Sequence, residues 1–294
     1  MILLALMQRR NFLAAAALIP AASAAPGHTY RLRYAPHVSS RDVSYERQLE
    51  VFAEQGFKAF EFNGLPKLKD SEIVALAKTK ERLGLAMGVF VMNRGGWKPS
   101  ALVDRQFHSD FLADVKRAVE IHKIIGNECA TATSGLGIDS LSYTQQTTNC
   151  IEALKRAGEI VEKTKMVIVL EPLNVRVDHA GYFVVMSNHG AEIIANVNHP
   201  NVKLLFDMYH QQISEGNLIN HIRQHYAQIG YMQVGDVPGR KEPGTGEINY
   251  QNVFKSIHAL GYKGILGMEH GWTKPGIDGM VEGFAQYRKA DSWT

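Results

Sequence analysis

Short apolar runs alternate with longer stretches whose apolar residues recur at helical spacing, from about residue 31 to the end of the chain. Several short runs, such as 85–92 and 166–171, are almost continuously apolar. Such runs are typical of parallel strands that are covered on both faces. The alternation therefore predicts an α/β fold, a single-domain (β/α)8 barrel over residues 30–294.

The bounds of the predicted elements follow from this periodicity and from glycines such as Gly56, Gly84, Gly126 and Gly261, which stand where helices are expected to end. Strands are predicted at residues 31–38, 58–63, 85–92, 128–133, 166–171, 202–207, 229–233 and 264–269. Helices are predicted at about 45–55, 70–83, 104–125, 143–163, 186–196, 216–224, 250–260 and 279–289.

The last four predicted strands each end in a residue with a side-chain oxygen: Glu171, Asp207, Gln233 and Glu269. Their spacings of 36, 26 and 36 residues each match about one βα unit. Residues two apart in a strand share a face, so all four can point into the mouth of the barrel. Taken singly, each acid would more often be a helix cap or a solvated strand end. Taken together, the four residues favour one site.

Three carboxylates this close would repel one another, and one divalent cation would remove the repulsion. Oxygen ligands without cysteine suit Mg²⁺ or Mn²⁺, and also Co²⁺. A cation held beside Glu171 and Glu269 would stabilise the enediolate of a hydroxy-carbonyl substrate. The two glutamates would exchange the proton between neighbouring carbons. This is the chemistry of aldose–ketose isomerisation or epimerisation.

The composition limits the partners of the chain. Its 294 residues are 45% hydrophobic, which is enough for one large core. The net charge is only +3, without a run of five or six like charges, so we expect a small-molecule substrate and no nucleic acid. Cys129 and Cys150 fall in a predicted strand and the following helix. Two free buried thiols are therefore favoured over one disulfide.

The first residues have the pattern of an export signal. Arg9 and Arg10 precede Phe-Leu and an alanine-rich apolar run, and an A-x-A cleavage pattern follows at 22–24. The arginine pair resembles a twin-arginine signal, which predicts that residues 1–25 direct export to the periplasm. An uncleaved tail on a cytoplasmic protein is the alternative, and Met7 is an alternative start. The run is too short to remain as a membrane anchor.

The C-terminal half contains longer motifs: EPLN at 171–174, DMYHQ at 207–211, QVGDVPGR at 233–240, EPGTGEINY at 242–250 and GME at 267–269. These residues resemble the hydroxypyruvate isomerases, within the xylose-isomerase-like TIM barrel superfamily of sugar isomerases and epimerases. The resemblance is close over residues 165–269 and looser over residues 30–130.

The resemblance implies that the four strand-end residues are the metal ligands and that Glu171 and Glu269 are also the catalytic pair. It implies that His210 and Arg240 contact oxygens of the substrate. A guanidinium group pairs well with a carboxylate such as that of a hydroxy-oxo acid. Related 3-epimerases have a further glutamate where this chain has Val177, which favours an isomerase.

Alternative roles remain open for three of the candidate site residues. Arg240 could instead form a salt bridge with Glu242 or Asp236 in its own loop. His210 could bind a strand-end carbonyl group. Trp97 could form a wall of the substrate pocket or be a packing anchor.

Four further polar residues are given structural roles. A structural role is favoured for His37, at the end of the first strand, and a solvated or capping role for Glu61. Asp236 is interpreted as a brace of its loop. Glu247 is expected to shape the turn before the helix at 250–260, with Asn249 as the N-cap.

The sequence thus predicts a metal-dependent isomerase of a small hydroxy-carbonyl compound, of the type that converts hydroxypyruvate to tartronate semialdehyde. One alternative is an epimerase or isomerase of a larger free sugar or a cyclitol. Another is an exported sugar-binding barrel without catalysis. A phosphodiesterase is disfavoured, because the strand ends offer acids and one amide where a multi-zinc site would need several histidines. The oligomeric state is left open, although barrels of this superfamily often form homo-oligomers.

Overall fold

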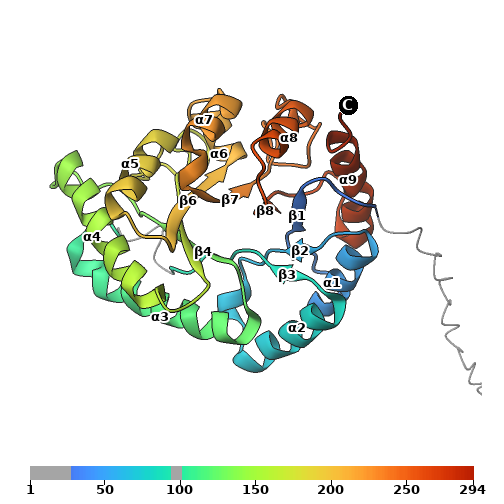
Figure 1. Cartoon of the computed structure of the whole chain (residues 1–294), viewed down its shortest axis with the longest axis horizontal. Coiled ribbons are helices and arrows are strands. Elements are labelled where there is room, and N and C mark those ends of the chain that lie inside the picture. The colour runs from blue at the N-terminus through green and yellow to red at the C-terminus, as the bar shows by residue number, and fades with distance from the viewer. Residues whose placement is uncertain (1–27, 94–100) are drawn as a thin grey trace, which may run out of the picture.

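The computed structural model describes residues 28–93 and 101–294, and it shows a ring of helices around a barrel of parallel strands (Figure 1). The predicted export signal and Trp97 lie outside the described residues. The strands are β1 (Arg33–Pro36), β2 (Ala59–Phe60), β3 (Ala86–Met87), β4 (Cys129–Thr133), β5 (Val167–Glu171), β6 (Val202–Asp207), β7 (Ile229–Gln233) and β8 (Ile265–Met268). All eight fall within or on the predicted runs.

The strands lie side by side in chain order. Six form one sheet in the order β1-β8-β7-β6-β5-β4, and β2 pairs with β3. Backbone hydrogen bonds on both sides of the β2–β3 pair close the ring: for example, Val38 N donates to Glu61 O at 2.9 Å, and Met92 N donates to Thr131 O at 3.0 Å. The predicted barrel is therefore confirmed. Strands β2 and β3 are shorter than predicted because only two residues of each pair regularly, and isolated bridges continue the contact.

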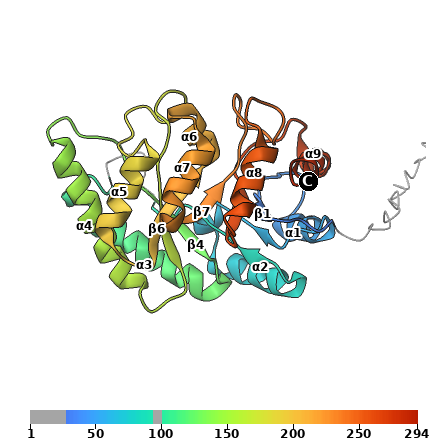
Figure 2. The ribbon, with the colours of Figure 1, turned by 45° about the horizontal axis from the view of Figure 1, so that its top comes forward.

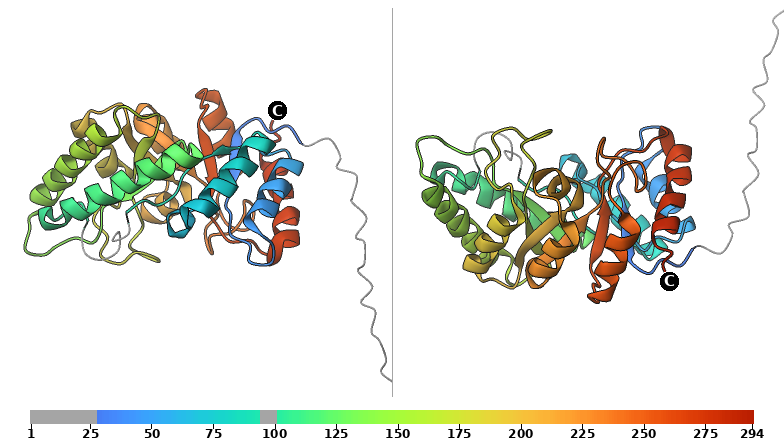
Figure 3. Two further views of the ribbon diagram at one scale, coloured as in Figure 1. Left: turned by 90° about the horizontal axis from the view of Figure 1, so that it is seen from below. Right: turned by 90° about the horizontal axis from the view of Figure 1, so that it is seen from above.

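Helices cover the outside of the barrel, as the tilted and side views show (Figures 2 and 3). The α-helices of the described residues are α1 (Tyr45–Glu54), α2 (Asp70–Leu83), α3 (His108–Ile125), α4 (Tyr143–Val161), α5 (Ser187–Val197), α6 (Met208–Ser214), α7 (Leu218–His225), α8 (Tyr250–Ala259) and α9 (Gly276–Ala290). Short 3-10 turns are η1 (Leu65–Lys67), η2 (Arg105–Phe107) and η3 (Tyr226–Gln228). Among these described helices, none has the length and apolarity needed to cross a membrane.

Helix α6 is an addition to the predicted set. It begins directly after Asp207, whose side chain accepts a hydrogen bond from Tyr209 N at 2.8 Å and so caps the helix. The sequence pattern missed α6 because the apolar run of β6 continues into it without a turn signal. At the other end of the chain, α9 lies between α8 and α1 and closes the ring (Figure 1).

Two apolar layers hold the barrel together. The larger one fills the space between strands and helices. The smaller one lies inside the barrel and consists of Ala35, Ala59, Val89, Cys129, Val169, Leu205, Tyr231 and Ile265. Val169, Leu205 and Tyr231 each stand two residues before a predicted strand-end ligand, so those ligands share the inward face, as expected. Cys129 and Cys150 are both buried free thiols, as predicted.

Gly267 occupies the position in β8 where the inner layer is tightest. A Cβ atom there would overlap the Glu61 carboxylate and come within 3.0 Å of the Tyr231 ring. A glycine is therefore required at this inward-facing position, since any side chain would compete with Glu61 for the same space.

We expect Gly267→Ala to lower the free energy of unfolding by about 1–3 kcal/mol, the usual cost of overpacking a filled core. Urea denaturation followed by circular dichroism measures this change. Gly137→Ala is the matched control, because its Cβ would meet no atom closer than 3.6 Å. Equal stability of the two variants would show that the space beside Gly267 is not filled.

Candidate active site

The four predicted strand-end residues come together at one end of the barrel. Glu171, Asp207 and Gln233 are the last residues of β5, β6 and β7, and Glu269 directly follows β8. Asp207 lies opposite Gln233 in the β6–β7 pairing. Three of the four are buried, and the Glu269 side chain remains 21% exposed. The arrangement places three carboxyl groups and one amide around the opening of the barrel.

The donor atoms of this group fit a divalent cation. One ligand atom each from Glu171, Asp207 and His210 lies within 4.8 Å of the others. The Gln233 Oε1 atom is buried and has no hydrogen-bond partner among the described residues. A buried carbonyl oxygen without a partner is costly, so this atom is suited to a ligand that the fold itself does not supply. Carboxylate and amide oxygens are the donors that Mg²⁺ and Mn²⁺ prefer.

The carboxyl groups at this opening hold their protons more strongly than usual. Burial, followed by the negative charges of Glu269 and Asp207, raises the pKa of Glu171 well above its usual range. Burial also raises the pKa of Asp207, although Arg240 opposes the rise. Burial raises the pKa of Glu269 to about 7. Added positive charge is therefore needed before all three can ionise near neutral pH.

Arg240 supplies positive charge from the loop after β7. Its Nη2 atom donates to Asp207 Oδ2 at 2.6 Å and to Glu269 Oε2 at 2.8 Å. Its Nε donates to the Glu269 backbone oxygen at 3.0 Å. The guanidinium also lies 4.7 Å from the centre of the Tyr209 ring. Arg240 thus contacts two predicted metal ligands, and the alternative of a salt bridge with an acid of its own loop is wrong.

Asp236 and Glu242, the two acids that could have paired with Arg240 within the loop, have other roles. Asp236 is fully buried, and its two carboxylate oxygens accept hydrogen bonds from the backbone N–H groups of Val237, Gly244, Gly246 and Ile248. The predicted role of Asp236 as a loop brace is confirmed. Glu242 accepts from Thr273 N at 2.9 Å. Asn249 caps α8 through Asn252 N at 3.2 Å, as predicted.

Glu61 is the clearest correction to the sequence interpretation. It is fully buried inside the barrel, not solvated at a strand end. His37 Nδ1 lies 3.2 Å from Glu61 Oε1, and Tyr231 Oη donates to Glu61 Oε2 at 3.1 Å. Gln233 Nε2 also donates to Glu61 Oε2, at 3.4 Å. Because the Gln233 N–H donates to this Glu61 oxygen, the Gln233 amide is oriented with its own oxygen away from Glu61.

Asn63 and Asn174 are further polar residues that the sequence interpretation gave no role. Asn63 Nδ2 donates to Glu269 Oε1, and Asn174 Nδ2 lies 2.7 Å from His210 Nδ1. Asn63 stands at the end of a predicted strand, so the rule that selected Glu171 would have found it. The signal for Glu61 was the order Ala-Phe-Glu-Phe at 59–62, in which the small Ala59 already marks the inward face.

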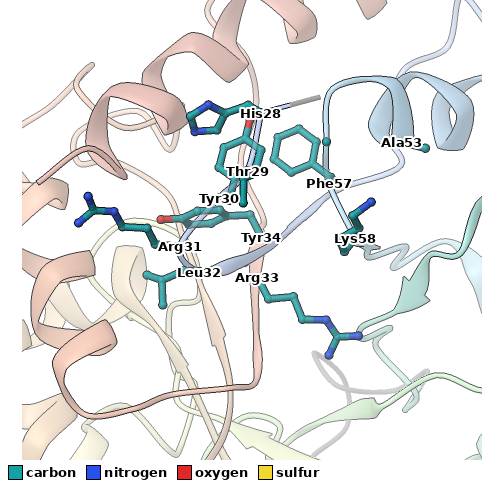
Figure 4. Close-up of a pocket in the computed structure, with 11 residues that line it drawn as sticks. His28, Thr29, Tyr30, Arg31, Leu32, Arg33, Tyr34, Ala53, Phe57 and Lys58 are labelled. Carbon is teal, nitrogen blue, oxygen red and sulfur yellow. The ribbon is translucent and has the colours of Figure 1, made fainter. Parts of the chain in front are cut away.

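A cavity of about 580 Å³ lies at the opposite end of the barrel, beside the start of β1 (Figure 4). Arg31, Arg33 and Lys58 line it. Arg33 pairs with Glu128 at 2.6 Å, and the Arg31 guanidinium lies over the Trp293 ring at 4.9 Å. None of the predicted site residues that the structure describes lines this cavity. The chemistry of the described residues is therefore concentrated at the carboxyl ends of the strands, as in other α/β barrels.

The fold and the acids at its mouth define an α/β barrel with a candidate metal site. The chain belongs to the xylose isomerase-like TIM barrel family, whose model matches residues 49–290. It is 32% identical over 241 residues to 2-oxo-tetronate isomerase of Cupriavidus necator, which covers 76% of this chain and 89% of that protein. It is 32% identical over 161 residues to hydroxypyruvate isomerase of Escherichia coli (strain K12), which covers 55% of this chain and 62% of that protein. The predicted resemblance is confirmed.

A solved structure has the same architecture. The crystal structure of AP endonuclease, family 2 from Brucella melitensis superposes on this chain with a TM-score of 0.79 at 25% sequence identity. The match covers 88% of this chain and 98% of the other. The single-domain barrel is thus shared over almost the whole described part.

The raised pKa of Glu269 predicts how the stability of the metal-free protein depends on pH. Between its unfolded value of 4.5 and its folded value of about 7, the folded state holds a proton that the unfolded state has lost. Stability from this group therefore falls as the pH rises through that range. We expect the melting temperature in EDTA to fall from pH 5 to pH 7, and added Mn²⁺ to raise it more at pH 7 than at pH 5.

Glu269→Gln is the control for this prediction, because it removes the titrating group and keeps the side-chain size. Differential scanning fluorimetry of the wild type and this variant at each pH isolates the contribution of Glu269. An identical pH dependence of the two proteins would contradict the assignment.

Proposed function

We propose that this chain is a divalent-metal-dependent isomerase that interconverts hydroxypyruvate and tartronate semialdehyde, or a 2-oxo acid of similar size. The observation that supports this function most is that Glu171 and Glu269 lie beside the buried carboxyl group of Asp207 and the guanidinium of Arg240. The names of the relatives from Cupriavidus necator and Escherichia coli support the same class of reaction. We also propose that residues 1–25 direct export and that the mature protein acts on a small-molecule substrate in the periplasm.

Glu171, Asp207, Gln233 and Glu269 would hold the cation. When bound, the cation supplies positive charge that acidifies the C–H between a carbonyl and a hydroxyl group and stabilises the enediolate oxygens. Gln233 adds a ligand oxygen without adding negative charge. Glu61 fixes the direction of that oxygen, so the fold prepares the ligand before anything binds.

The proton transfer is assigned to the two glutamates. A proton leaves C3 of hydroxypyruvate and one is returned to C2, while the hydroxyl proton moves from O3 to O2. With a pKa of about 7, Glu269 can take up and release a proton near neutral pH, which is the requirement for a general acid–base group. Asn63 and Arg240 hold both oxygens of this carboxylate in place.

Substrate recognition is assigned to Arg240 and His210. Arg240 Nη2 reaches both Asp207 and Glu269, so the guanidinium already lies at the acidic group. A carboxylate on the substrate would pair with this guanidinium beside the reacting carbons. A neutral sugar lacks that partner, which is why an oxo acid is proposed over a free ketose.

Proton exchange in D₂O tests the proposed function. We expect the Mn²⁺- or Mg²⁺-loaded protein to place deuterium in hydroxypyruvate and to form tartronate semialdehyde, followed by NMR. Glu269→Gln should retain metal binding and lose turnover by at least about 10²-fold, since general acid–base groups contribute about 10²–10⁴-fold.

Three outcomes would change the proposal. Exchange only on members of a ketose panel would move the substrate to a larger sugar. Metal binding without exchange on any compound would indicate a binding protein. Full activity of Glu269→Gln would refute the role of that residue.

Arg240→Ala tests the recognition of the carboxylate. We expect the KM for hydroxypyruvate to rise about 10- to 100-fold, as for the loss of a hydrogen bond to a charged group worth about 1.5–3 kcal/mol. The KM for a neutral hydroxy ketone should change little. Steady-state kinetics at saturating metal compares the two substrates. Equal increases for both would mean that Arg240 does not bind the carboxylate.

A further inference from the structure

The Asn174 side chain is held in one orientation by three partners. Its Oδ1 atom accepts from Val177 N at 2.9 Å and from Asp178 N at 3.3 Å. Its Nδ2 atom donates to Asp178 Oδ2 at 2.8 Å. The end of the amide that faces the backbone N–H groups must be the oxygen, and the end that faces the carboxylate must be the nitrogen. Both ends of the amide are therefore assigned independently. Asn174 itself is fully buried, in the loop after β5.

This orientation decides which nitrogen of His210 has the proton. The Asn174 Nδ2 atom lies 2.7 Å from His210 Nδ1, and the Asn174 backbone N lies 3.4 Å from the same nitrogen. Both groups are donors, so Nδ1 must accept and has no proton. The proton of the neutral ring is then on Nε2. That nitrogen lies 3.6 Å from Asp207 Oδ2, which is beyond hydrogen-bond distance.

We propose that Asn174 is a positioning residue that fixes His210 in its Nε2–H form, so that His210 donates a hydrogen bond to a substrate oxygen and is not a metal ligand. The inference deepens the proposed function, because it names how an uncharged donor is directed to the oxygen of a hydroxy-carbonyl substrate. It also gives the three buried residues at the mouth different roles. Glu171 and Asp207 keep free lone pairs for a cation, whereas the Nε2 atom of His210 has a proton and no free lone pair.

The position of His210 in the site suits a hydrogen-bond donor that is not a metal ligand. His210 is 1% exposed and stands in α6, three residues after Asp207, so its ring is held beside the acids. A donor on an uncharged ring stabilises developing negative charge on an oxygen without competing for the carboxylates, as an oxyanion-binding group does. Gln233 Oε1 has no hydrogen-bond partner among residues 28–93 and 101–294, so it can offer the ligand atom that a coordinating His210 would otherwise provide.

Imidazole ¹⁵N NMR of the metal-free protein reads the tautomer directly and needs no substrate. The His210 signals are assigned among the 12 histidines by their loss in His210→Gln. We expect a protonated Nε2 and an unprotonated Nδ1. Pulsed EPR of the Mn²⁺-loaded protein should show no directly coordinated imidazole nitrogen. A proton on Nδ1, or a coordinated imidazole, would overturn the proposal.

The double variant N174D/D178N tests the role of Asn174. It exchanges the carboxylate and the amide within one pair, so the net charge stays the same. The carboxylate at position 174 then faces Nδ1 and can only accept, which requires the proton to move to Nδ1. We expect that change in the NMR spectrum and a fall in kcat of about 10- to 100-fold, the usual effect of removing an orienting partner of a site residue.

Two controls separate this effect from a general loss of structure. D178N alone keeps the two backbone donors to Asn174 Oδ1, so the tautomer and most of kcat should be retained. N196D adds a carboxylate on the exposed face of α5 and should change neither. If the double variant does not fold, the wild-type tautomer still decides the proposal. A folded double variant with the proton still on Nε2 would refute the role of Asn174.

The two proposals fail separately. Absence of turnover on hydroxypyruvate with an Nε2–H tautomer would reject the substrate and leave the role of Asn174 intact. Turnover with a proton on Nδ1 would reject the role of Asn174 and leave the reaction intact.

Discussion

The concentration of buried carboxyl groups at the mouth of the barrel determines most of the site. Glu171, Asp207 and Glu269 are brought together by the ends of β5, β6 and β8, and burial raises the pKa of each. Such a group is stable only when positive charge or protons compensate it. Arg240 provides that charge through Asp207 and Glu269. Asp236 holds the loop that contains Arg240 through hydrogen bonds to its backbone, and so helps to keep the positive charge of Arg240 beside the carboxyl groups.

The second constraint is the direction of each polar side chain. Amides have one donor end and one acceptor end, and the amides of Gln233 and Asn174 are each oriented by a carboxyl group. Glu61 binds Gln233 Nε2, and Oε1 is left without a hydrogen-bond partner in the described part of the chain. Asp178 binds Asn174 Nδ2 and leaves the second N–H for His210. Acids outside the predicted ligand set, Glu61 and Asp178, thus decide which neighbouring atoms are donors and which are acceptors.

The space for Glu61 shows how packing and chemistry depend on each other. A carboxylate inside an apolar barrel is tolerated only with several hydrogen bonds and with room for its oxygens. Tyr231, Gln233 and His37 supply the hydrogen bonds, and the missing side chain of Gly267 supplies the room. Burial of the His37 ring lowers its pKa, but the hydrogen bond and the charge of Glu61 outweigh this effect and raise the pKa overall. The inner layer is therefore both a core and the base of the site.

The sequence by itself determined the fold and the location of the site. The alternation of apolar runs and helical periods fixed eight strands, because each element must bury one face at its own period. Residues at the ends of those runs are forced to the same opening, which placed Glu171, Asp207, Gln233 and Glu269 without any knowledge of contacts. The missed helix α6 shows the limit of this method, since no turn residue separates it from β6.

Only the tertiary structure decided the partners of the polar side chains. Glu61 meets Tyr231, 170 residues away, and Arg240 bypasses the acids of its own loop to reach Asp207. Asn174 lies in a recognisable motif, but its effect on His210 depends on the direction of an amide. Periodicity specifies which face a residue occupies. It does not specify where a side chain ends or which hydrogen-bonding atom it presents, because these depend on distances between strands that are far apart in the chain.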